Sequence, residues 1–219
     1  MRPIELLHDE GGLVVVDKPA GLEATGRTRD DPGGVEHHLS RLLRQRVWAV
    51  HQLDRETTGA LIFVRRKPLV AVWTERLRSA RKRYLAIVHG SPQAQTVDAA
   101  LAYDSDLRRW VVSDDGKPAK TAFQTLSSGA EAALVEGRPT TGRTHQIRVH
   151  LASIGHPLFG ESRHVQPACK RHPRHALHLE RIEVMGQVFR SPIPSDLVAL
   201  ASELGLALPE ECAQAPHTR

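Results

Sequence analysis

The spacing of apolar and polar positions along the chain predicts many short strands and a few helices. Runs rich in Val, Ile, Leu and aromatic residues, each bounded by Gly, Pro or charged residues, are typical of strands. We expect strands at residues 11–17, 47–50, 60–64, 84–88, 109–112, 121–126 and 132–135. Residues 26–34 are polar and rich in Gly, so we expect a loop there.

Four segments have the spacing of helices that bury one face. They are residues 35–46, a stretch opened by Pro68, residues 144–154 and residues 196–204. The apolar residues on the buried faces include Leu39, Leu42, Leu43, Trp73, Leu77, Ala80, Ile147, Leu151 and Ile154. The expected caps are Thr144, Ser195, Gly155 and Gly205. Because strands and helices do not alternate regularly, we predict an α+β fold with a mixed, mainly antiparallel sheet and flanking helices.

Length and composition narrow the class of protein. The 219 residues fit a single domain spanning 1–219. Lys and Arg outnumber Asp and Glu by 30 to 25, which gives a formal net charge of +5 and favours a polyanionic partner such as nucleic acid. The cysteines, Cys169 and Cys212, lie far apart, and the N-terminus has no apolar signal core. We therefore expect a cytoplasmic protein without a disulfide framework or a membrane span.

A carboxylate lies in a polar loop between two apolar strands, in the segment VHQLDRETTGALIFV. This residue is Asp54, and the turn-formers Thr57, Thr58 and Gly59 that follow it can fix the loop and allow a close approach of the backbone. Two interpretations stay open on this segment alone. Asp54 is either a reactive carboxylate or part of an ordinary turn between two strands.

A second segment, GRTHQIRVHL, places basic residues around the start of a predicted helix. Arg143 and Arg148 flank a helix N-terminus, which attracts anions, and His145 and Gln146 add hydrogen-bond donors. The apolar face of the helix leaves Arg148 beside the core, where a guanidinium needs a carboxylate partner. The alternative is a solvated basic helix end.

A third segment, RKRYLAIVHG, places a tyrosine on a predicted strand. Tyr84 alternates with Ala86 and Val88, so the three side chains project to one face. Its ring either belongs to the core or packs against a base or sugar.

Taken together and in this order, the segments resemble the RluA-type pseudouridine synthases. The family's usual His-Arg-Leu-Asp corresponds to residues 51–54, its late motif GRTHQIRVHL is intact at residues 142–151, and GHP follows at residues 155–157. The pattern Lys-x-Tyr-x-Ala matches Lys82, Tyr84 and Ala86. The segments VVDKPAGL (15–22), LHLERIEV (177–184) and SPIPSDL (191–197) are also similar to the family, so the resemblance covers nearly the whole chain.

The resemblance implies an RNA pseudouridine synthase fold with a central RNA-binding cleft, and it implies roles for three residues. Asp54 would attack uridine, Tyr84 would line the base pocket and Arg148 would pair with the aspartate. Structured RNA, ribosomal or transfer, would be the substrate. The reaction moves one bond and oxidises nothing, so we expect no cofactor and no metal. We also expect a monomer. We expect no N-terminal domain of the S4 type, because the chain begins almost directly at the segments that resemble the family's catalytic domain.

One position departs from the family pattern. Gln52 stands where the family usually has an arginine that enters the gap left by the flipped base. Gln carries no charge and stacks poorly. We therefore expect either a uridine that is already unpaired or a neighbouring residue that takes over this role.

Basic and polar residues near these segments are the expected RNA contacts. The predicted RNA-binding residues are Gln52, Arg55, Arg65, Arg66, Lys67, Arg143, His145 and Gln146. Further candidates for phosphate contacts are Arg27, Arg29 and Arg171. The dense basic run at residues 76–83 is open between RNA contact and solubility.

Other interpretations compete with these predictions. His164, Cys169, His172 and His175 form a cluster whose spacing matches no standard zinc motif, so a basic loop interrupted by Pro is favoured over a metal site. A catalytically inactive RNA-binding relative is one rival function. A nucleoside or glycoside hydrolase is another, but such enzymes generally need a second carboxylate, and only Glu56 lies near Asp54 in the sequence.

Overall fold

The computed structural model describes residues 4–28, 31–169 and 171–210, and the chain divides into two compact units. The first unit holds the described residues up to Lys82 together with Leu179–Pro192. The second holds Arg83–His178 and the described residues from Ile193 onward. The predicted single domain of residues 1–219 therefore stays a prediction, and each unit is described by itself.

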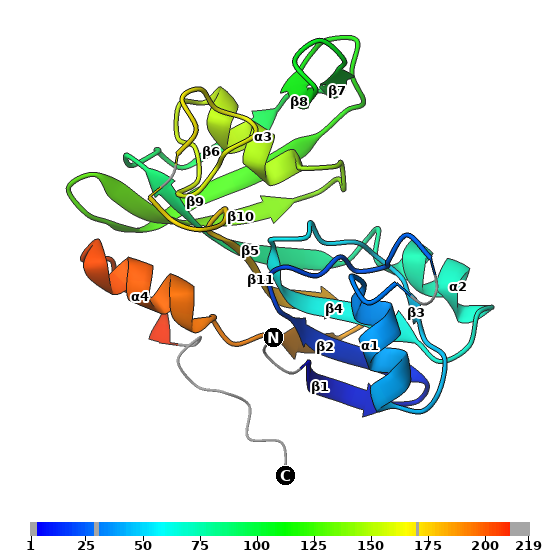
Figure 1. The fold of residues 1–219 in the computed structure, drawn as a ribbon. Helices are drawn as coiled ribbons and strands as arrows, with labels where there is room; N and C mark the ends of the chain where they lie inside the picture. The colour runs from blue at the N-terminus through cyan, green and yellow to red at the C-terminus, as the bar shows by residue number, and fades with distance from the viewer. Residues whose placement is uncertain (1–3, 29–30, 170, 211–219) are drawn as a thin grey trace. The chain divides into compact units, whose positions relative to one another are not determined.

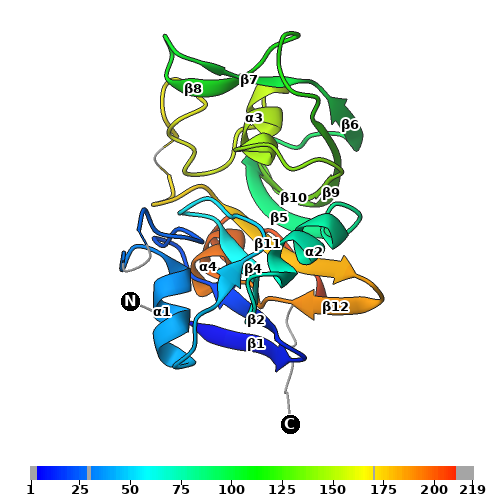
Figure 2. The same cartoon turned by 90° about the vertical axis from the view of Figure 1, so that its right-hand side faces the viewer.

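The first unit is built on a mainly antiparallel sheet with two helices (Figure 1). Its strands are β1 (Glu5–Glu10), β2 (Leu13–Lys18), β3 (Trp48–Ala49), β4 (Thr58–Val64), most of β11 (Leu177–Val184) and β12 (Gln187–Arg190). Its helices are α1 (Val35–Leu42) and α2 (Leu69–Arg76). Strands β2 and β4 are buried along their whole length, which explains their nearly continuous apolar sequences. Helix α1 runs beside β1 and β2 (Figures 1 and 2).

The second unit is a four-stranded antiparallel sheet in the order β5-β10-β9-β6. Its strands are β5 (Arg81–His89), β6 (Gln95–Asp98), β9 (Lys120–Ser128) and β10 (Ala132–Pro139), with a separate hairpin of β7 (Leu101–Asp104) and β8 (Arg109–Val112). Its helices are α3 (Gln146–Ser153) and α4 (Ser195–Glu203).

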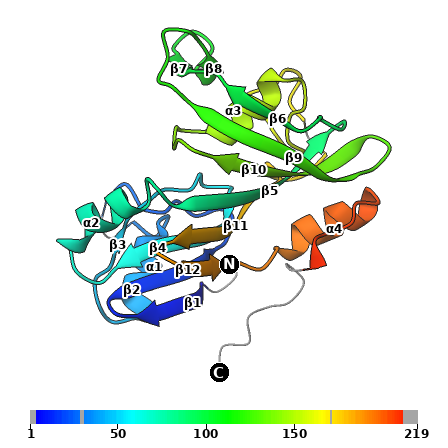
Figure 3. The ribbon, with the colours of Figure 1, turned by 180° about the vertical axis from the view of Figure 1, so that it is seen from behind.

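The two helices of the second unit cover opposite faces of its sheet (Figures 1 and 3). Leu85 and Ile87 of β5 pack in one apolar cluster with Leu197 and Leu200 of α4. The alternate residues of the same strand, Ala86 and Val88, pack in a second cluster that contains two residues of α3. This division follows from the two-residue period of a strand, which sends successive side chains to opposite faces.

The predicted fold class is confirmed: the sheets are mixed and mainly antiparallel, and helices flank them. Every strand expected from the sequence is present, although the one expected at residues 47–50 is only two residues long. Strands β1, β6, β7, β11 and β12 were not predicted. They are short or partly polar, and their pairing with neighbours stabilises them more than their own sequence does. No helix in the described part of the chain is long and apolar enough to cross a membrane.

The predicted helix caps were partly wrong. Helix α3 begins after His145, which has a left-handed backbone with φ of 56° and no capping side-chain bond, so Thr144 is not the cap. The Gln146 side chain satisfies the entry instead, because its Oε1 accepts hydrogen bonds from the Arg143 amide at 3.0 Å and the Thr141 hydroxyl at 2.7 Å. Ser195 lies inside α4, and Pro194 takes the cap position.

The expected C-terminal end of helix α2 was also wrong. Helix α2 ends at Arg76, so Ala80 lies outside it. Trp73 and Leu77 are buried as expected.

Gly59 permits a close approach of two backbones at the start of β4. Its φ is 126°, and a Cβ added there would lie 2.3 Å from the carbonyl oxygen of Leu179 in β11. The close neighbour of this glycine is therefore a strand of the same unit. Only a residue without a side chain fits this position.

We predict that Gly59→Ala lowers the free energy of unfolding by about 2 kcal/mol or more, because the methyl group collides with backbone and the φ is strained. Urea denaturation measures the change. Gly142→Ala is the matched control, since a Cβ there meets no atom within 4 Å, and its effect should stay within about 0.5 kcal/mol. Equal midpoints for the two variants would contradict the proposed close approach.

Candidate active site

Asp54 lies in a tight turn between β3 and β4, in the first unit. The Asp54 carbonyl oxygen accepts a hydrogen bond from the Thr57 amide at 3.0 Å. Thr57 and Thr58 are buried, at 2% and 4% exposure, while Asp54 itself is half-buried. The segment therefore presents a carboxylate from a turn whose far end is packed into the core.

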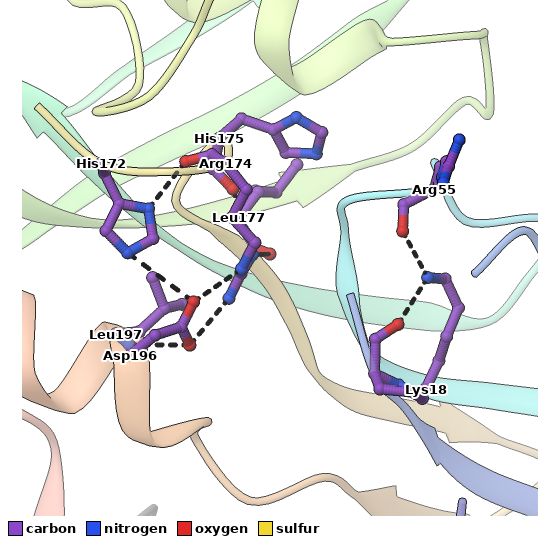
Figure 4. A network of polar contacts seen from close by, with 9 residues as sticks. Lys18, Arg55, His172, Arg174, His175, Leu177, Asp196 and Leu197 are labelled. Carbon is purple, nitrogen blue, oxygen red and sulfur yellow. Dashed lines mark hydrogen bonds and ion pairs between the residues drawn. The ribbon is translucent and has the colours of Figure 1, made fainter. Parts of the chain in front are cut away.

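A buried lysine holds the residue next to Asp54. Lys18, at the end of β2, is fully buried, and its Nζ donates to the carbonyl oxygens of Pro19 and Arg55, each at 2.9 Å (Figure 4). The Arg55 carbonyl also accepts from the Gly21 amide at 3.0 Å, and Arg55 Nε donates to the Gly21 carbonyl at 3.0 Å. The backbone after Asp54 is thus fixed by the DKPAG segment, residues 17–21.

His51 fixes the other side of the same loop. Its Nε2 accepts a hydrogen bond from the Ile62 amide at 3.2 Å, so the ring proton is on Nδ1. Burial and the nearby charge of Lys82 lower the pKa of His51 to about 3. The imidazole is therefore neutral near pH 7 and acts as a fixed acceptor in the framework of the loop.

The two polar residues that flank Asp54 differ in their surroundings. Gln52 is exposed, and its Nε2 lies 3.4 Å from the Thr25 hydroxyl oxygen, to which it donates. The Arg55 side chain is 67% exposed and has one long contact with Glu56, at 3.7 Å. Arg55 therefore carries a solvent-facing cation next to Asp54, whereas Gln52 carries none.

Tyr84 lies in the second unit, where β5 places it opposite Gly137 of β10. It packs against the cluster that contains Ala86, Val88 and, from α3, Ile147 and Leu151. The predicted shared face of Tyr84, Ala86 and Val88 is therefore confirmed. The structure brings Tyr84 to the same side of the sheet as α3, the helix that carries Arg148.

Arg148 is buried and paired with a carboxylate that the sequence analysis did not identify. Its Nε and Nη2 donate to Oε2 and Oε1 of Glu161, at 2.8 and 2.9 Å, and the exposures of the two residues are 6% and 0%. Glu161 also accepts from the amides of Arg163 and His164. A signal was present in the sequence, because Glu161 is the only acidic residue between Glu136 and Glu180.

The environment keeps Glu161 ionised. Burial alone raises the pKa of its carboxyl, but the hydrogen bond and charge of Arg148 outweigh burial and bring the pKa to about 2. The expectation that Arg148 lies beside the core and needs a carboxylate is confirmed. Its further pairing with Asp54, which belongs to the other unit, stays a prediction.

A pair of imidazoles joins the start of α3 to the loop after Glu161. His145 Nδ1 lies 2.9 Å from His164 Nε2, and His164 Nδ1 lies 3.1 Å from the Trp110 carbonyl oxygen. Burial lowers the pKa of His164 to about 4, so its ring is neutral. Because a carbonyl only accepts, His164 Nδ1 carries the proton, and His164 Nε2 then accepts from His145 Nδ1. This order of donors fixes the tautomer of His145.

The predicted basic RNA contacts include arginines that bind partners within the protein and cations that are exposed. Arg65 pairs with Asp9, Arg171 pairs with Glu131, and Arg143 Nε donates to the Pro118 carbonyl. In the run at residues 76–83, ion pairs join Arg78 to Glu75, Arg81 to Glu183 and Arg83 to Glu136. Arg27, Arg66 and Lys67 are exposed. Arg29 lies outside the described residues. These RNA contacts stay predictions.

The side chains of the His and Cys cluster have separate partners. Cys169 Sγ lies 2.8 Å from His89 Nε2, and His172 Nε2 lies 3.7 Å from Asp196, which Arg174 also binds (Figure 4). Among the described residues, no three His, Cys, Asp or Glu side chains form a group that would hold a metal ion. Cys212 lies outside the described residues.

Comparison with known proteins decides the family. The sequence profile of RNA pseudouridylate synthases matches residues 12–153, which include Asp54, Tyr84 and Arg148. The chain belongs to the RNA pseudouridylate synthase family. A relative named ribosomal large subunit pseudouridine synthase D, from Zymomonas mobilis, is 34% identical over 90% of this chain and 72% of its own length.

A second relative and two solved structures carry names of the same family. The protein of the same name from Nitrosomonas europaea is 34% identical over 90% of this chain, but this chain spans only 64% of that protein. The solved structure of human RNA pseudouridylate synthase domain containing 4 superposes with a TM-score of 0.79 at 26% identity, covering 94% of this chain and 95% of that one. A second human structure, domain containing 1, has a TM-score of 0.74 at 23% identity and shows the same fold.

We predict that Glu161→Gln lowers the free energy of unfolding at pH 7 by about 3–5 kcal/mol, because the buried guanidinium of Arg148 loses its bidentate carboxylate partner. The wild-type contribution of Glu161 is fully present above pH 4.5 and is lost as the pH falls toward 2, since folding lowers its pKa from 4.5 to about 2. The variant should lack this acid-dependent loss. Denaturation curves across this pH range measure both effects.

Glu75→Gln is the control for that experiment. Glu75 forms an exposed pair with Arg78, and such pairs contribute about 0–1 kcal/mol. If the two Glu→Gln variants proved equally stable at pH 7, the importance assigned to the buried pair would be refuted.

We predict that Lys18→Met slows uridine isomerisation by about 10- to 100-fold, because the backbone next to Asp54 loses its donor and the carboxylate shifts. RNA affinity should change little, since the ammonium is buried. Single-turnover kinetics and RNA binding separate the two effects. Lys117→Met, at an exposed lysine, is the control. A rate equal to that of the control would mean that Lys18 does not position the loop.

Proposed function

We propose that this chain isomerises specific uridines in structured RNA to pseudouridine, with Asp54 as the nucleophile and no cofactor. The observation that carries the proposal is the Asp54 turn, which lies within the residues that match the family, resembles its nucleophile motif and is fixed on both sides by Lys18 and His51. A carboxylate held by its own backbone loses little freedom when it engages a ribose.

The reaction needs few groups. The bond between the ribose C1′ and uracil N1 breaks, a bond between C1′ and uracil C5 forms, and the proton of C5 leaves while N1 gains one. Asp54 either attacks the nucleotide or promotes elimination to a glycal, and both routes use the ionised carboxylate. A base that removes the C5 proton completes the sequence without any oxidant, reductant or donor group.

Tyr84 and Arg148 take the supporting roles. Tyr84 holds the face of the detached uracil and relays the proton. Arg148 keeps Asp54 ionised, and its bidentate pair with Glu161 supports this role because Glu161 occupies Nε and Nη2 and so fixes the direction of the guanidinium.

The proposed RNA contacts are basic and polar residues around the three motifs. Arg55 is the cation beside Asp54 that can assist the flipped nucleotide where Gln52 carries no charge. Gln52, Arg65, Arg66, Lys67, Arg143, His145 and Gln146 complete the proposed set. Because named relatives act on the ribosomal large subunit, large-subunit ribosomal RNA is the proposed substrate, with transfer RNA as the second choice.

We predict that Asp54→Asn abolishes tritium release from RNA labelled at uridine C5, to less than about one thousandth of the wild-type rate, because an amide is not a nucleophile at pH 7. RNA binding should persist. Asp106→Asn, at an exposed aspartate of the β7–β8 hairpin, should keep full activity. Equal tritium release from wild type and Asp54→Asn would overturn the proposal.

Absence of release from the wild type on ribosomal and transfer RNA, with binding retained, would instead favour the inactive RNA-binding relative. Mass spectrometry of the product adds a second check. Isomerisation leaves the RNA mass unchanged, whereas a hydrolase would remove the base.

A further inference from the structure

A group of cations without acidic partners lies at the end of α1. Arg41, Arg44 and Arg46 are exposed and line one surface hollow together with His37, Ser40 and Gln45. The only acid in its lining is Glu36. None of the three arginines has an ion pair with a carboxylate among the described residues.

This lack of pairing distinguishes the group from ten other arginines of the described residues. Ion pairs with Asp or Glu engage Arg55, Arg65, Arg78, Arg81, Arg83, Arg138, Arg148, Arg171, Arg174 and Arg190. The three arginines around the α1 hollow therefore concentrate positive charge that no ion pair with a described carboxylate neutralises. Such a concentration attracts a polyanion.

Backbone conformation adds to the argument. Arg44 follows the C-terminus of α1 with a φ of 49°, in the left-handed region where helices commonly place glycine. A side chain there costs about 1 kcal/mol relative to glycine. The position thus carries a guanidinium where backbone preference favours no side chain at all.

An aromatic residue extends the charged group toward α2. The Arg46 guanidinium lies 4.8 Å from the centre of the Trp48 ring. Trp48 in turn lines a mostly apolar hollow with Lys67, Pro68, Val70 and Ala71 at the start of α2. In Figure 1, β3 lies between α1 and α2. Cations that surround a partly exposed indole are the combination that binds nucleic-acid strands, because phosphates pair with the cations and a base stacks on the ring.

The chain connects this surface directly to the Asp54 turn. Trp48 belongs to β3, and the segment from β3 leads through His51 to Asp54 within the same unit. The Thr74 hydroxyl donates to the Val50 carbonyl at 3.2 Å, so α2 is tied to the same segment. The six residue steps from Trp48 to Asp54 span at most about 20 Å, which corresponds to no more than about six nucleotides of a stacked strand.

We propose that Arg41, Arg44, Arg46, Trp48 and Lys67, the α1–β3 surface, bind the RNA strand that flanks the modified uridine. The arginines and Lys67 contact phosphates, and Trp48 stacks with one base. This inference rests on the proposed function, because it assigns a substrate-binding surface to the same reaction.

Removal of three charges tests the surface. The variant Arg41→Gln/Arg44→Gln/Arg46→Gln should bind a short fluorescein-labelled RNA strand more weakly in an anisotropy assay. The slope of log affinity against log salt concentration should fall by about 2, since each lost contact with single-stranded RNA removes about 0.7. Trp48→Leu should weaken binding about 5-fold or more. Single-turnover tritium release at saturating RNA should keep the wild-type rate in both variants.

Two matched variants complete the design. Arg41→Lys/Arg44→Lys/Arg46→Lys keeps the charge and should keep the salt slope, which excludes misfolding as the cause of a loss. Arg108→Gln/Arg109→Gln/Lys117→Gln removes the same charge from the β7–β8 region. An equal fall in slope for this control and the α1 variant would overturn the proposal, because a general charge effect would then suffice.

Failure of this inference is distinguishable from failure of the proposed function. If wild type releases tritium and the α1 variant binds RNA as wild type does, the surface is not an RNA site and the function stands. If wild type releases no tritium, the proposed function fails. The anisotropy assay still tests whether the surface binds RNA. Binding of wild type to phosphatidylserine vesicles but not to RNA would also overturn the proposal.

Discussion

The ion pair between Arg148 and Glu161 is the interaction on which the second unit's site depends. Helix α3 is buried on nearly every side, so its only arginine must lie in a region that solvates charge poorly. Glu161 stabilises the buried guanidinium by accepting hydrogen bonds from it with both carboxylate oxygens. The same carboxylate also accepts hydrogen bonds from two backbone amides. One carboxylate therefore orients the helix side chain and folds the following loop at the same time.

In the first unit, a buried cation has a comparable role through hydrogen bonds to peptide carbonyls. Lys18 donates to two peptide carbonyls, one of them adjacent to Asp54. Hydrogen bonds from a charged donor are stronger than those between neutral groups. The turn is thus stiff at the residue that follows Asp54, while the neutral ring of His51 stiffens the residues before it.

The sequence was informative where one physical requirement dominated. Continuous apolar runs predicted β2 and β4 because both strands are buried throughout, and the alternation of Tyr84 with Ala86 and Val88 predicted their common face. The need of Arg148 for a carboxylate was also predictable, although its identity was not, since Glu161 lies 13 residues away beyond the end of the helix. The predicted N-terminal cap of α3 was wrong for a related reason. The segment that leads into α3 is held by the side chain of Gln146, which binds residues three and five positions earlier, and a rule based on Ser and Thr does not anticipate this.

The hydrogen bonds of the imidazole pair at the start of α3 all run in one direction. Protons point from His145 to His164 and from His164 to the peptide of Trp110, so a flip of the His145 ring breaks one of these contacts and a flip of the His164 ring breaks both. The hairpin of β7 and β8, remote in sequence, thereby decides which nitrogen of His145 carries hydrogen. A change of residue in that hairpin that shifts the Trp110 carbonyl would reverse the polarity of an imidazole thirty-five positions further along the chain, without altering any residue of the motif in which it lies.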